Sequence, residues 1–330
     1  MFKRILFIGL GGAGQRHLRI ISGILPNAEL IAYRQLEKTP LLNPDFSVNS
    51  DSTLESKYKI GIYHDLNDAY KRKPDLVIIS TPTSLHCEHI IRASNEGAAI
   101  IVEKPGSINH LEASKVSEIL KKNNTRFLIS FQRRFHPLVI KLKELLEKKG
   151  IDKINYIDVK VSSYVPAWHP YEDYKKLYAC KSLLGGGVLL TESHEIDFII
   201  WLFGLPDSVM SKISSRQELS LDVEDSALIS LDYARFKVNI ELDFMSKNRE
   251  RSIDVTSGSE SYFLNLESQT LTFINNEGTT SIDEIIISND SMFENQFNYF
   301  MNSNNSSSYS DALVNNLTLI DWCKNKNISV

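Results

Sequence analysis

The feature that most constrains this chain is a glycine-rich turn placed directly after a short apolar strand. Residues 5–14 read ILFIGLGGAG, and Gly9, Gly11 and Gly14 give the spacing GxGxxG between a predicted strand at 5–9 and a predicted helix. Gly9 permits a tight exit from the strand, Gly11 lets backbone N–H groups approach a ligand, and Gly14 lets the helix pack closely. Because a helix N-terminus also offers unpaired N–H groups and a positive dipole end, the turn predicts a dinucleotide phosphate site. The pattern alone leaves open a glycine-rich core turn that binds nothing.

Length, charge and cysteine content narrow the class of protein. The chain has 330 residues, with 37 Lys plus Arg against 41 Asp plus Glu and a net charge of -4. This length predicts two domains, and the charge argues against nucleic acid as the main partner. No run approaches the roughly 18 apolar residues of a membrane-spanning helix, so no membrane partner is expected. Three widely spaced cysteines without a CxxC pair predict neither a disulfide framework nor a metal site, and they fit the cytoplasm.

Strand and helix patterns alternate through the first part of the chain. The predicted strands are 5–9, 29–33, 76–80, 98–102 and 126–130, and the predicted helices between them are 12–25, 65–72, 86–96 and 111–122. The polar stretch 37–56 is predicted to be a loop with a short helix. This βαβ rhythm predicts a Rossmann domain with a doubly wound parallel sheet, assigned to residues 1–125.

After a predicted helix at 138–149, capped by Gly150, the apolar period shifts towards two. Alternating segments at 154–165, 227–234, 236–244, 252–257, 262–268 and 270–276 predict an open, mostly antiparallel sheet. A helix is predicted at 187–203, others at 292–301 and 311–324, and a loop at 302–310, which reads NSNNSSSYS. These elements predict a substrate-binding and oligomerisation domain over residues 126–330, with the option that its C-terminal helix packs back on the first domain.

Further motifs at fixed positions identify a known family. With the glycine turn and His17, the chain has STPTSLHCEH at 80–89, VEKPGS at 102–107 and FQRRFHP at 131–137. In this combination it resembles the Gfo/Idh/MocA oxidoreductases over nearly its whole length. The resemblance implies a Rossmann domain joined to a domain with an open antiparallel sheet, NAD or NADP as cofactor, and action on sugars, inositols or nucleotide sugars. It also implies a homodimer or homotetramer, since open sheets in this family commonly pack against a partner's sheet.

The motif EKP contains the first predicted catalytic residue. Lys104 follows the buried strand AAIIV and Glu103, so it should project from the carboxyl end of a strand into the ligand crevice. A lysine there can hydrogen-bond a reacting hydroxyl and favour the developing alkoxide. The resemblance assigns Lys104 this role, often with a cis Lys–Pro peptide. A solvated Lys–Pro turn is the alternative.

The second predicted catalytic residue is His194, in GGGVLLTESHEIDFIIWLFG at residues 185–204. His194 and Asp197 lie three residues apart and would share one face of a helix. The resemblance implies that His194 exchanges the hydroxyl proton, which suits an imidazole pKa of about 6.5. The family pattern has an aspartate four residues before the histidine. That place is Leu190, or Thr191 when counted from the glycines, so the Asp–His pair is absent. A helix-packing histidine bonded to Asp197 stays open.

Cofactor choice depends on the end of the second strand. The sequence AELIAYRQ puts Arg34 where an Asp or Glu usually holds the adenosine ribose, so no carboxylate there would repel a 2′-phosphate and Arg34 could pair with it. This predicts NADP in preference to NAD, with an exposed arginine that binds no ligand as the alternative. The predicted cofactor-binding residues are Gly9, Gly11, Gly12, Ala13, Gly14, Arg34, Thr81, Pro82, His86, Glu103 and Lys104.

The segment 163–187 is rich in aromatic and charged residues and predicts substrate recognition. Trp168, Tyr171 and Tyr174 can stack on sugar or base rings, and cationic side chains can meet phosphate or carboxylate oxygens. An anionic sugar or nucleotide sugar fits them best, although aromatic residues in such a loop can equally be packing anchors. The WHP sequence also resembles members that suggest surface-glycan sugar biosynthesis. The predicted substrate-binding residues are Arg134, Trp168, His169, Tyr174, Lys181 and Asp197.

Together these inferences predict a cytoplasmic, NADP-preferring oxidoreductase that oxidises a sugar hydroxyl or reduces the corresponding ketone. Lys104 would orient and polarise the oxygen, His194 would carry the proton, and both would converge on one carbon that faces the nicotinamide. The missing aspartate motivates a second hypothesis, a dinucleotide-bound sugar-binding or regulatory protein without turnover. An imine or a non-sugar acid as substrate also stays open.

Overall fold

The chain folds into two compact units, each built from separate stretches of sequence. The computed structural model describes residues 2–35, 37–169, 172–216, 218–303, 307–325 and 328–329. The first unit comprises Met1–Ser130, His169–Asp173 and Asn289–Val314, and the second comprises Phe131–Trp168, Tyr174–Ser288 and Asn315–Val330. The division after Ser130 lies beyond the boundary expected at residue 125, because the strand at 127–130 is part of the first unit's sheet.

A parallel six-stranded sheet forms the centre of the first unit, in the order β5-β2-β1-β6-β7-β8. Because helices cover such sheets, its strands are nearly continuous apolar runs, and Ile5, Leu6, Phe7 and Ile8 of β1 are all buried. The strand β5, three residues long, was not predicted, because so short a segment shows no periodicity. The strands are β1 (Arg4–Ile8), β2 (Glu29–Tyr33), β5 (Gly61–Tyr63), β6 (Leu76–Ile79), β7 (Ala99–Glu103) and β8 (Phe127–Ser130).

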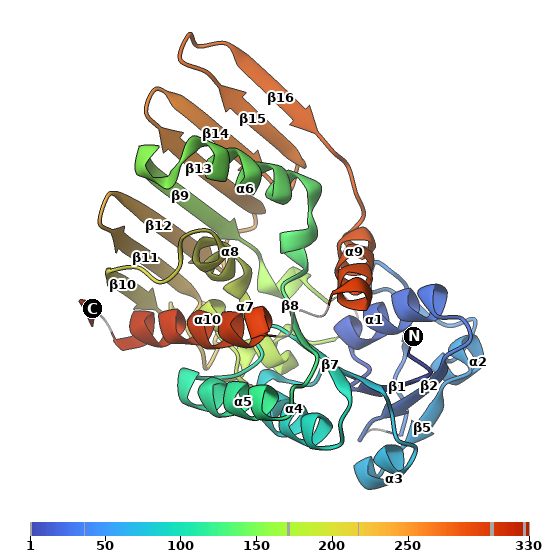
Figure 1. Cartoon of the computed structure of the whole chain (residues 1–330). Coiled ribbons are helices and arrows are strands. Elements are labelled where there is room, and N and C mark those ends of the chain that lie inside the picture. Colours follow the sequence, from blue (N-terminus) through green and yellow to red (C-terminus); the bar gives the residue numbers. More distant parts are fainter. Residues whose placement is uncertain are drawn as a thin grey trace. The chain divides into compact units, whose positions relative to one another are not determined.

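Helices connect these strands, and a late helix joins them. Figure 1 shows α4 and α5 side by side, and α9 packs on α1. Arg19 of α1 donates a bidentate pair of hydrogen bonds to Asp290 of α9, from Nε to Oδ2 at 2.9 Å and from Nη2 to Oδ1 at 2.8 Å. The fold therefore ties residue 290 to the first helix of the chain. The helices are α1 (Gly12–Ile24), α3 (Leu66–Lys71), α4 (His86–Asn95), α5 (His110–Lys122) and α9 (Asn289–Asn302).

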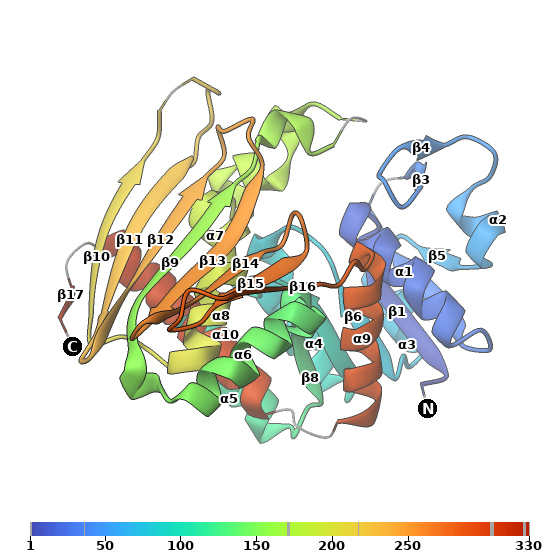
Figure 2. The ribbon, with the colours of Figure 1, turned by 90° about the horizontal axis from the view of Figure 1, so that it is seen from above.

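The predicted loop at 37–56 contains a small hairpin, β3 (Leu41–Leu42) with β4 (Val48–Asn49), and α2 (Leu54–Tyr58) follows it. Gln15 of α1 holds the hairpin, since its amide donates to the Pro40 carbonyl at 2.8 Å and accepts from the Leu42 N–H at 2.8 Å. At the hairpin tip, the Phe46 ring lies 2.8 Å from where a Cβ on Gly12 would be. The hairpin therefore packs on the first turn of α1 (Figure 2).

A nine-stranded sheet forms the second unit, in the order β16-β15-β14-β13-β9-β12-β11-β10-β17. Among the described strands every pairing in this sheet is antiparallel except that of β12 with β9. The open, mostly antiparallel sheet predicted from the period-two segments is therefore confirmed. The strands are β9 (Ile154–Ser162), β10 (Ser208–Ser214), β11 (Ser226–Tyr233), β12 (Phe236–Asp243), β13 (Glu250–Ser257), β14 (Glu260–Asn265), β15 (Thr270–Ile274), β16 (Thr280–Glu284) and β17 (Ile328–Ser329).

Helices of the second unit lie on one face of this sheet (Figure 1). The helix α6 (Pro137–Lys149) packs on β14 and β15, and the short α7 (Val188–Thr191) packs on β11 and β12. Gly150, with φ 94°, ends α6 as predicted. The loop predicted at 302–310 is only partly correct, since α10 (Ser307–Asn325) already begins at Ser307 and residues 304–306 lie outside the described part of the chain.

Candidate active site

The glycine turn forms a cradle whose geometry fits a dinucleotide phosphate. Gly9 has φ +95°, and a Cβ on it would lie 2.7 Å from the Ser80 carbonyl oxygen. A Cβ on Gly14 would lie 2.3 Å from the Gly9 carbonyl oxygen, so a side chain there would push α1 away from β1. A Cβ on Gly11, in contrast, would meet nothing within 4 Å. The turn is therefore closed towards the sheet and open in front of the helix N-terminus, where a pyrophosphate would bind. Gly12 and Ala13 form the first turn of the same helix.

The EKP segment places a hydrogen-bonded pair of side chains, Glu103 and His17, beside Lys104. The Glu103 carboxylate accepts a hydrogen bond from Nε2 of His17, on α1, at 2.8 Å. Burial raises the pKa of Glu103, but the hydrogen bond from His17 and the positive charges of His17 and Lys104 outweigh it and hold the pKa below its usual value. The peptide between Lys104 and Pro105 is cis. Glu103 thus anchors the end of β7 to α1, and its contact with a cofactor stays a prediction.

The segment after β6 is held by a buried histidine. His86 is 1% exposed, and its Nε2 donates to the Thr81 carbonyl at 2.8 Å. Burial lowers the pKa of His86 to about 4, so the ring is neutral at physiological pH. His86 therefore fixes the backbone of Thr81, while Thr81 and Pro82 are half-buried and remain candidates for cofactor contact.

The structure corrects the premise that no carboxylate lies near Arg34. Arg34 follows β2 as predicted, but it is 9% exposed, and its Nη2 pairs with Oε1 of Glu55 at 2.6 Å. Glu55 comes from α2, 21 residues further along the chain. The alternative that Arg34 is an exposed arginine without a ligand is therefore wrong with respect to its exposure. A 2′-phosphate would have to compete with Glu55 for Arg34.

In the second unit, His194 lies at the start of a buried helix. The helix predicted over 187–203 is interrupted at Glu192, which separates α7 from α8 (Ser193–Phe203). His194 is 5% exposed, and its ring meets that of Phe131 edge-on, with the centroids 5.9 Å apart. The histidine is thus held in a fixed environment by the segment that precedes α6.

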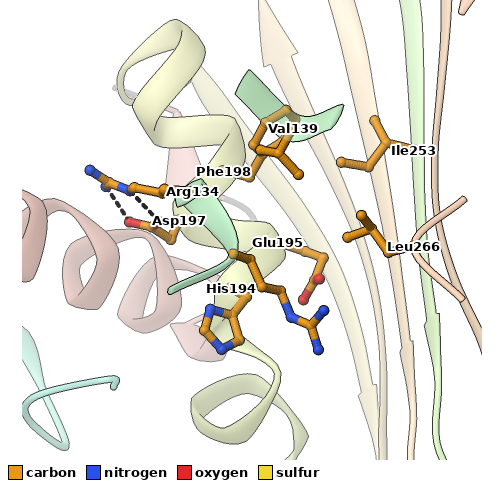
Figure 3. Close-up of a pocket in the computed structure, with 9 residues that line it drawn as sticks. Arg134, Val139, His194, Glu195, Asp197, Phe198, Ile253 and Leu266 are labelled. Carbon is orange, nitrogen blue, oxygen red and sulfur yellow. Dashed lines mark hydrogen bonds and ion pairs between the residues drawn. The ribbon is translucent and has the colours of Figure 1, made fainter. Parts of the chain in front are cut away.

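Arg134 and Asp197 are brought together, but they bind each other. Arg134 donates to both carboxylate oxygens of Asp197, from Nε at 2.7 Å and from Nη2 at 2.5 Å (Figure 3). Asp197 is 2% exposed. Burial raises the pKa of Asp197, and the positive charge of Arg134 opposes that shift. Because Arg134 already donates to both carboxylate oxygens, Asp197 does not need His194 as a hydrogen-bond partner.

A cavity of about 20 Å³ lies between this helix and the sheet. It holds about one water molecule and is too small for a sugar ring. His194 and Asp197 both line it, so they share a helix face as their spacing predicted (Figure 3). The other lining residues are Arg133, Arg134, Val139, Glu195, Phe198, Ile253 and Leu266.

The remaining predicted substrate residues have separate surroundings. The Trp168 ring packs edge-on against Phe244, with the centroids 5.2 Å apart, and the Tyr174 hydroxyl donates to the Leu219 carbonyl at 3.3 Å. Lys181 is exposed. His169 belongs to the first unit, where its ring lies 5.4 Å from that of Phe46 and its Nδ1 bonds Glu172 at 2.7 Å. Tyr171 lies outside the described residues. Trp168 is therefore at least partly a packing anchor.

Comparison with known protein families establishes the family to which this chain belongs. The sequence model described as "Oxidoreductase family, NAD-binding Rossmann fold" matches residues 3–131, and that of the GFO/IDH/MocA C-terminal domain matches residues 139–262. The chain belongs to the Gfo/Idh/MocA family. Its first unit thus contains the NAD-binding Rossmann domain of that family, in agreement with the cradle at the start of α1.

Relatives of this Gfo/Idh/MocA protein include two dehydrogenases of Bacillus subtilis (strain 168). Scyllo-inositol 2-dehydrogenase (NAD(+)) is 31% identical over 153 residues, 46% of this chain and 42% of the relative. Scyllo-inositol 2-dehydrogenase (NADP(+)) IolW is 25% identical over 163 residues, 49% of this chain and 44% of the relative. The matches thus span about half the length of these curated relatives. One relative is named for NAD and the other for NADP.

Solved structures of Gfo/Idh/MocA type have the same fold. Levoglucosan dehydrogenase in complex with NADH and levoglucosan superposes with a TM-score of 0.77 at 17% identity, covering 99% of both chains. The WlbA dehydrogenase from Bordetella pertussis, in complex with NADH and UDP-GlcNAcA, gives a TM-score of 0.77 at 17% identity and covers 99% of this chain and 97% of the other. At this identity the likeness establishes the fold.

Sequence reasoning missed a buried charge network in this Gfo/Idh/MocA chain. Arg251 of β13 donates to Oε2 of Glu192 at 2.7 Å and also pairs with Glu195. Burial acts to lower the pKa of Arg251, but the two carboxylates raise it above its ordinary value. Glu192 and Glu195 flank His194 in TESHE, which was a signal, whereas nothing in the strand pattern marks Arg251. The network fixes the break between α7 and α8.

Membrane-spanning helices and metal-binding clusters are both absent from the described residues of this Gfo/Idh/MocA protein. No helix among them is long and apolar enough to span a membrane. No group of three or more His, Cys, Asp or Glu side chains among them could hold a metal ion.

Proposed function

We propose that this protein is an NAD(P)-dependent oxidoreductase that transfers a hydride between a nicotinamide and a hydroxyl or ketone of a sugar or nucleotide sugar. The observation that carries the proposal is the cradle at Gly11, open in front of α1, in the unit that also holds Lys104 at the end of β7. When bound, the nicotinamide supplies the hydride acceptor or donor. Ligands of open α/β sheets bind beyond the carboxyl ends of the strands, which is where Lys104 follows β7.

The chain's own residues would manage charge and protons. The Lys104 ammonium donates a hydrogen bond to the reacting oxygen and stabilises the negative charge that develops on it. His194 takes the hydroxyl proton during oxidation or returns it during reduction. His17 and Glu103 hold the strand end from which Lys104 projects, through their 2.8 Å hydrogen bond.

The substrate class rests on the relatives and on the predicted binding residues. Proteins similar to this chain are named for scyllo-inositol, and similar folds were solved with levoglucosan or UDP-GlcNAcA. Tyr174 and Lys181 remain candidates for stacking and for binding an anionic group, which favours a nucleotide sugar. The WHP sequence at 168–170, which resembles that of other family members, supports a role in surface-glycan sugar biosynthesis. In the described part of the chain, Cys87, Cys180 and Cys323 form no disulfide, which supports a reducing cytoplasm as the place of action.

Self-association through the open face of the nine-stranded sheet is part of the proposal. Met210 and Leu228 are 66% and 53% exposed, and Ile282 near the other edge is 64% exposed. The strand register places all three on one face. Exposed apolar side chains on one sheet face favour burial against a second copy, as a homodimer or homotetramer.

The test is a comparison of Lys104→Ala, His194→Ala and the wild type in binding and in turnover. We expect Lys104→Ala to lower turnover of NADPH or NADH with a panel of keto-sugars at least about a thousandfold, and His194→Ala about a hundredfold or more. Both variants should bind the reduced dinucleotide, followed by its fluorescence, within about threefold of the wild type. Lys115→Ala, which removes an exposed lysine of α5, is the matched control and should change neither quantity.

Equal turnover by the wild type and Lys104→Ala would contradict the proposed mechanism. If the wild type binds both a dinucleotide and a sugar nucleotide but no sugar is turned over, the binding or regulatory protein without activity is the better account.

A further inference from the structure

Arg34 is the first residue after β2, the position at which Rossmann domains discriminate between NAD and NADP. Arg34 follows directly on β2, and its N–H donates to the Tyr63 carbonyl of β5 at 3.2 Å. In a Rossmann domain the group at the end of the second strand meets the adenosine ribose, which carries a 2′-hydroxyl in NAD and a 2′-phosphate in NADP. What already binds Arg34 therefore affects which dinucleotide can bind.

Among the described residues, the Arg34 guanidinium makes its hydrogen bonds through one nitrogen. Nη2 donates to Oε1 of Glu55 at 2.6 Å and to the backbone carbonyl of Glu37 at 2.6 Å. Nε and Nη1 are buried and have no hydrogen-bond partner in the part of the chain that the structure describes. A phosphate that approaches from solvent must therefore compete with Glu55 for Nη2.

The Glu55 carboxylate is held in place and stays charged. Thr53 caps α2 by accepting a hydrogen bond from the Ser56 N–H at 3.2 Å, which fixes the short helix that carries Glu55. The pKa of Glu55 is lowered by the hydrogen bond from its own backbone N–H, with a further contribution from Arg34, against a smaller opposing effect of burial. The side chain is 41% exposed, so part of it is accessible from solvent.

We propose that Glu55 is a specificity-determining residue that disfavours a 2′-phosphate. Its negative charge repels the phosphate and occupies the Arg34 nitrogen that would bind it. A 2′-hydroxyl carries no charge and can donate a hydrogen bond to the same carboxylate. Glu55 thus does from α2 what an acidic residue at the end of β2 does in NAD-specific Rossmann domains. The inference rests on dinucleotide binding by the first unit and is independent of the catalytic part of the proposed function.

The test measures dissociation constants of NADH and NADPH by nicotinamide fluorescence on the full-length wild type, Glu55→Gln and Glu37→Gln. We expect Glu55→Gln to tighten NADPH binding about tenfold relative to NADH, the size of one charge-assisted hydrogen bond. The NADH constant itself should change less than about threefold. Glu37→Gln is the matched control, because it removes an exposed carboxylate from the same loop while Arg34 binds only the Glu37 backbone.

A second variant tests whether the gain passes through Arg34. In Arg34→Gln with Glu55→Gln, the gain in NADPH affinity should be lost, because the freed guanidinium is the group that would bind the phosphate. An NADPH to NADH ratio that does not move in Glu55→Gln, or that moves equally in Glu37→Gln, would overturn the role of Glu55. A wild type that binds neither dinucleotide would overturn both this role and the proposed function.

Discussion

At the scale of single residues, the candidate site depends on buried charges that are paired with one another. Arg134 with Asp197 and Arg251 with Glu192 lie in the second unit, where a charge without its partner would be strongly destabilising. Residues with chemistry-bearing side chains therefore also hold the fold. Arg134 and Asp197 were predicted from the sequence to bind substrate, and their mutual pairing gives them a structural role first.

Removal of one partner should show the size of that role. We expect Asp197→Asn to lower the free energy of unfolding by about 3 kcal/mol, because the Arg134 guanidinium, 11% exposed, would keep its charge without a carboxylate. Chemical denaturation of the full chain measures the change. Asp68→Asn is the matched control, since the Asp68 pair with Lys71 is largely exposed and should contribute no more than about 0.5 kcal/mol. Equal effects of the two variants would contradict the structural role.

The sequence identified residues with a local signature and missed those paired over long distances. The glycine turn, Lys104 and His194 stand in recognisable motifs, and their elements were located correctly. Glu55 was missed because it lies 21 residues from Arg34 in a five-residue helix, too short for a periodic signal. Arg251 was missed because its strand pattern looks like that of any other strand, although it pairs with Glu192, 59 residues earlier.

At the scale of elements, the three glycines of the turn have unequal roles. Gly9 and Gly14 bring β1, α1 and the Ser80 segment together, whereas Gly11 has open space in front of it. Most helices and strands were predictable because the apolar periodicity of each extends over many residues. The break at Glu192 was not predicted, since no glycine or proline between residues 188 and 203 marks the end of a helix there.

The difference between the glycines can be tested with alanine. We expect Gly14→Ala to lower the free energy of unfolding by about 2 to 3 kcal/mol, because its Cβ would lie 2.3 Å from a backbone oxygen. Gly11→Ala should leave that free energy within about 0.5 kcal/mol but weaken NADH binding at least about tenfold, since its Cβ enters the phosphate space. Gly23→Ala is the control, because a Cβ on Gly23, near the end of the same helix, would meet nothing within 4 Å. This variant should lower neither the free energy of unfolding nor the affinity for NADH. Unchanged NADH affinity in Gly11→Ala would contradict the phosphate site.

At the scale of the whole molecule, the open face of the nine-stranded sheet is the surface whose partner is proposed to be a second copy. Leu228 lies opposite Lys212 on one side and Glu241 on the other in the register, so charged side chains lie among the exposed apolar residues. Such a mixed surface is typical of an interface between folded subunits.

Light scattering after gel filtration tests this interface. The wild type should have a mass of two or four chains of 37.5 kDa, and Met210→Lys with Leu228→Lys should move it towards one chain. Leu111→Lys is the control, because Leu111 is 64% exposed on α5 of the first unit and lies outside the sheet. A monomeric wild type, or a double-lysine variant of unchanged mass, would contradict self-association through this face.

The ion pair between Arg19 of α1 and Asp290 of α9 has a consequence for the order in which the protein can fold. During translation, α1 emerges from the ribosome long before α9. The face of α1 that packs on α9 therefore stays exposed until nearly the entire polypeptide has been synthesised. Until then the side of α1 that contacts Phe293 is exposed to solvent. In a chain truncated before residue 289 this side would remain exposed. Chaperone capture and proteolysis of incomplete chains should therefore concentrate on the first helix.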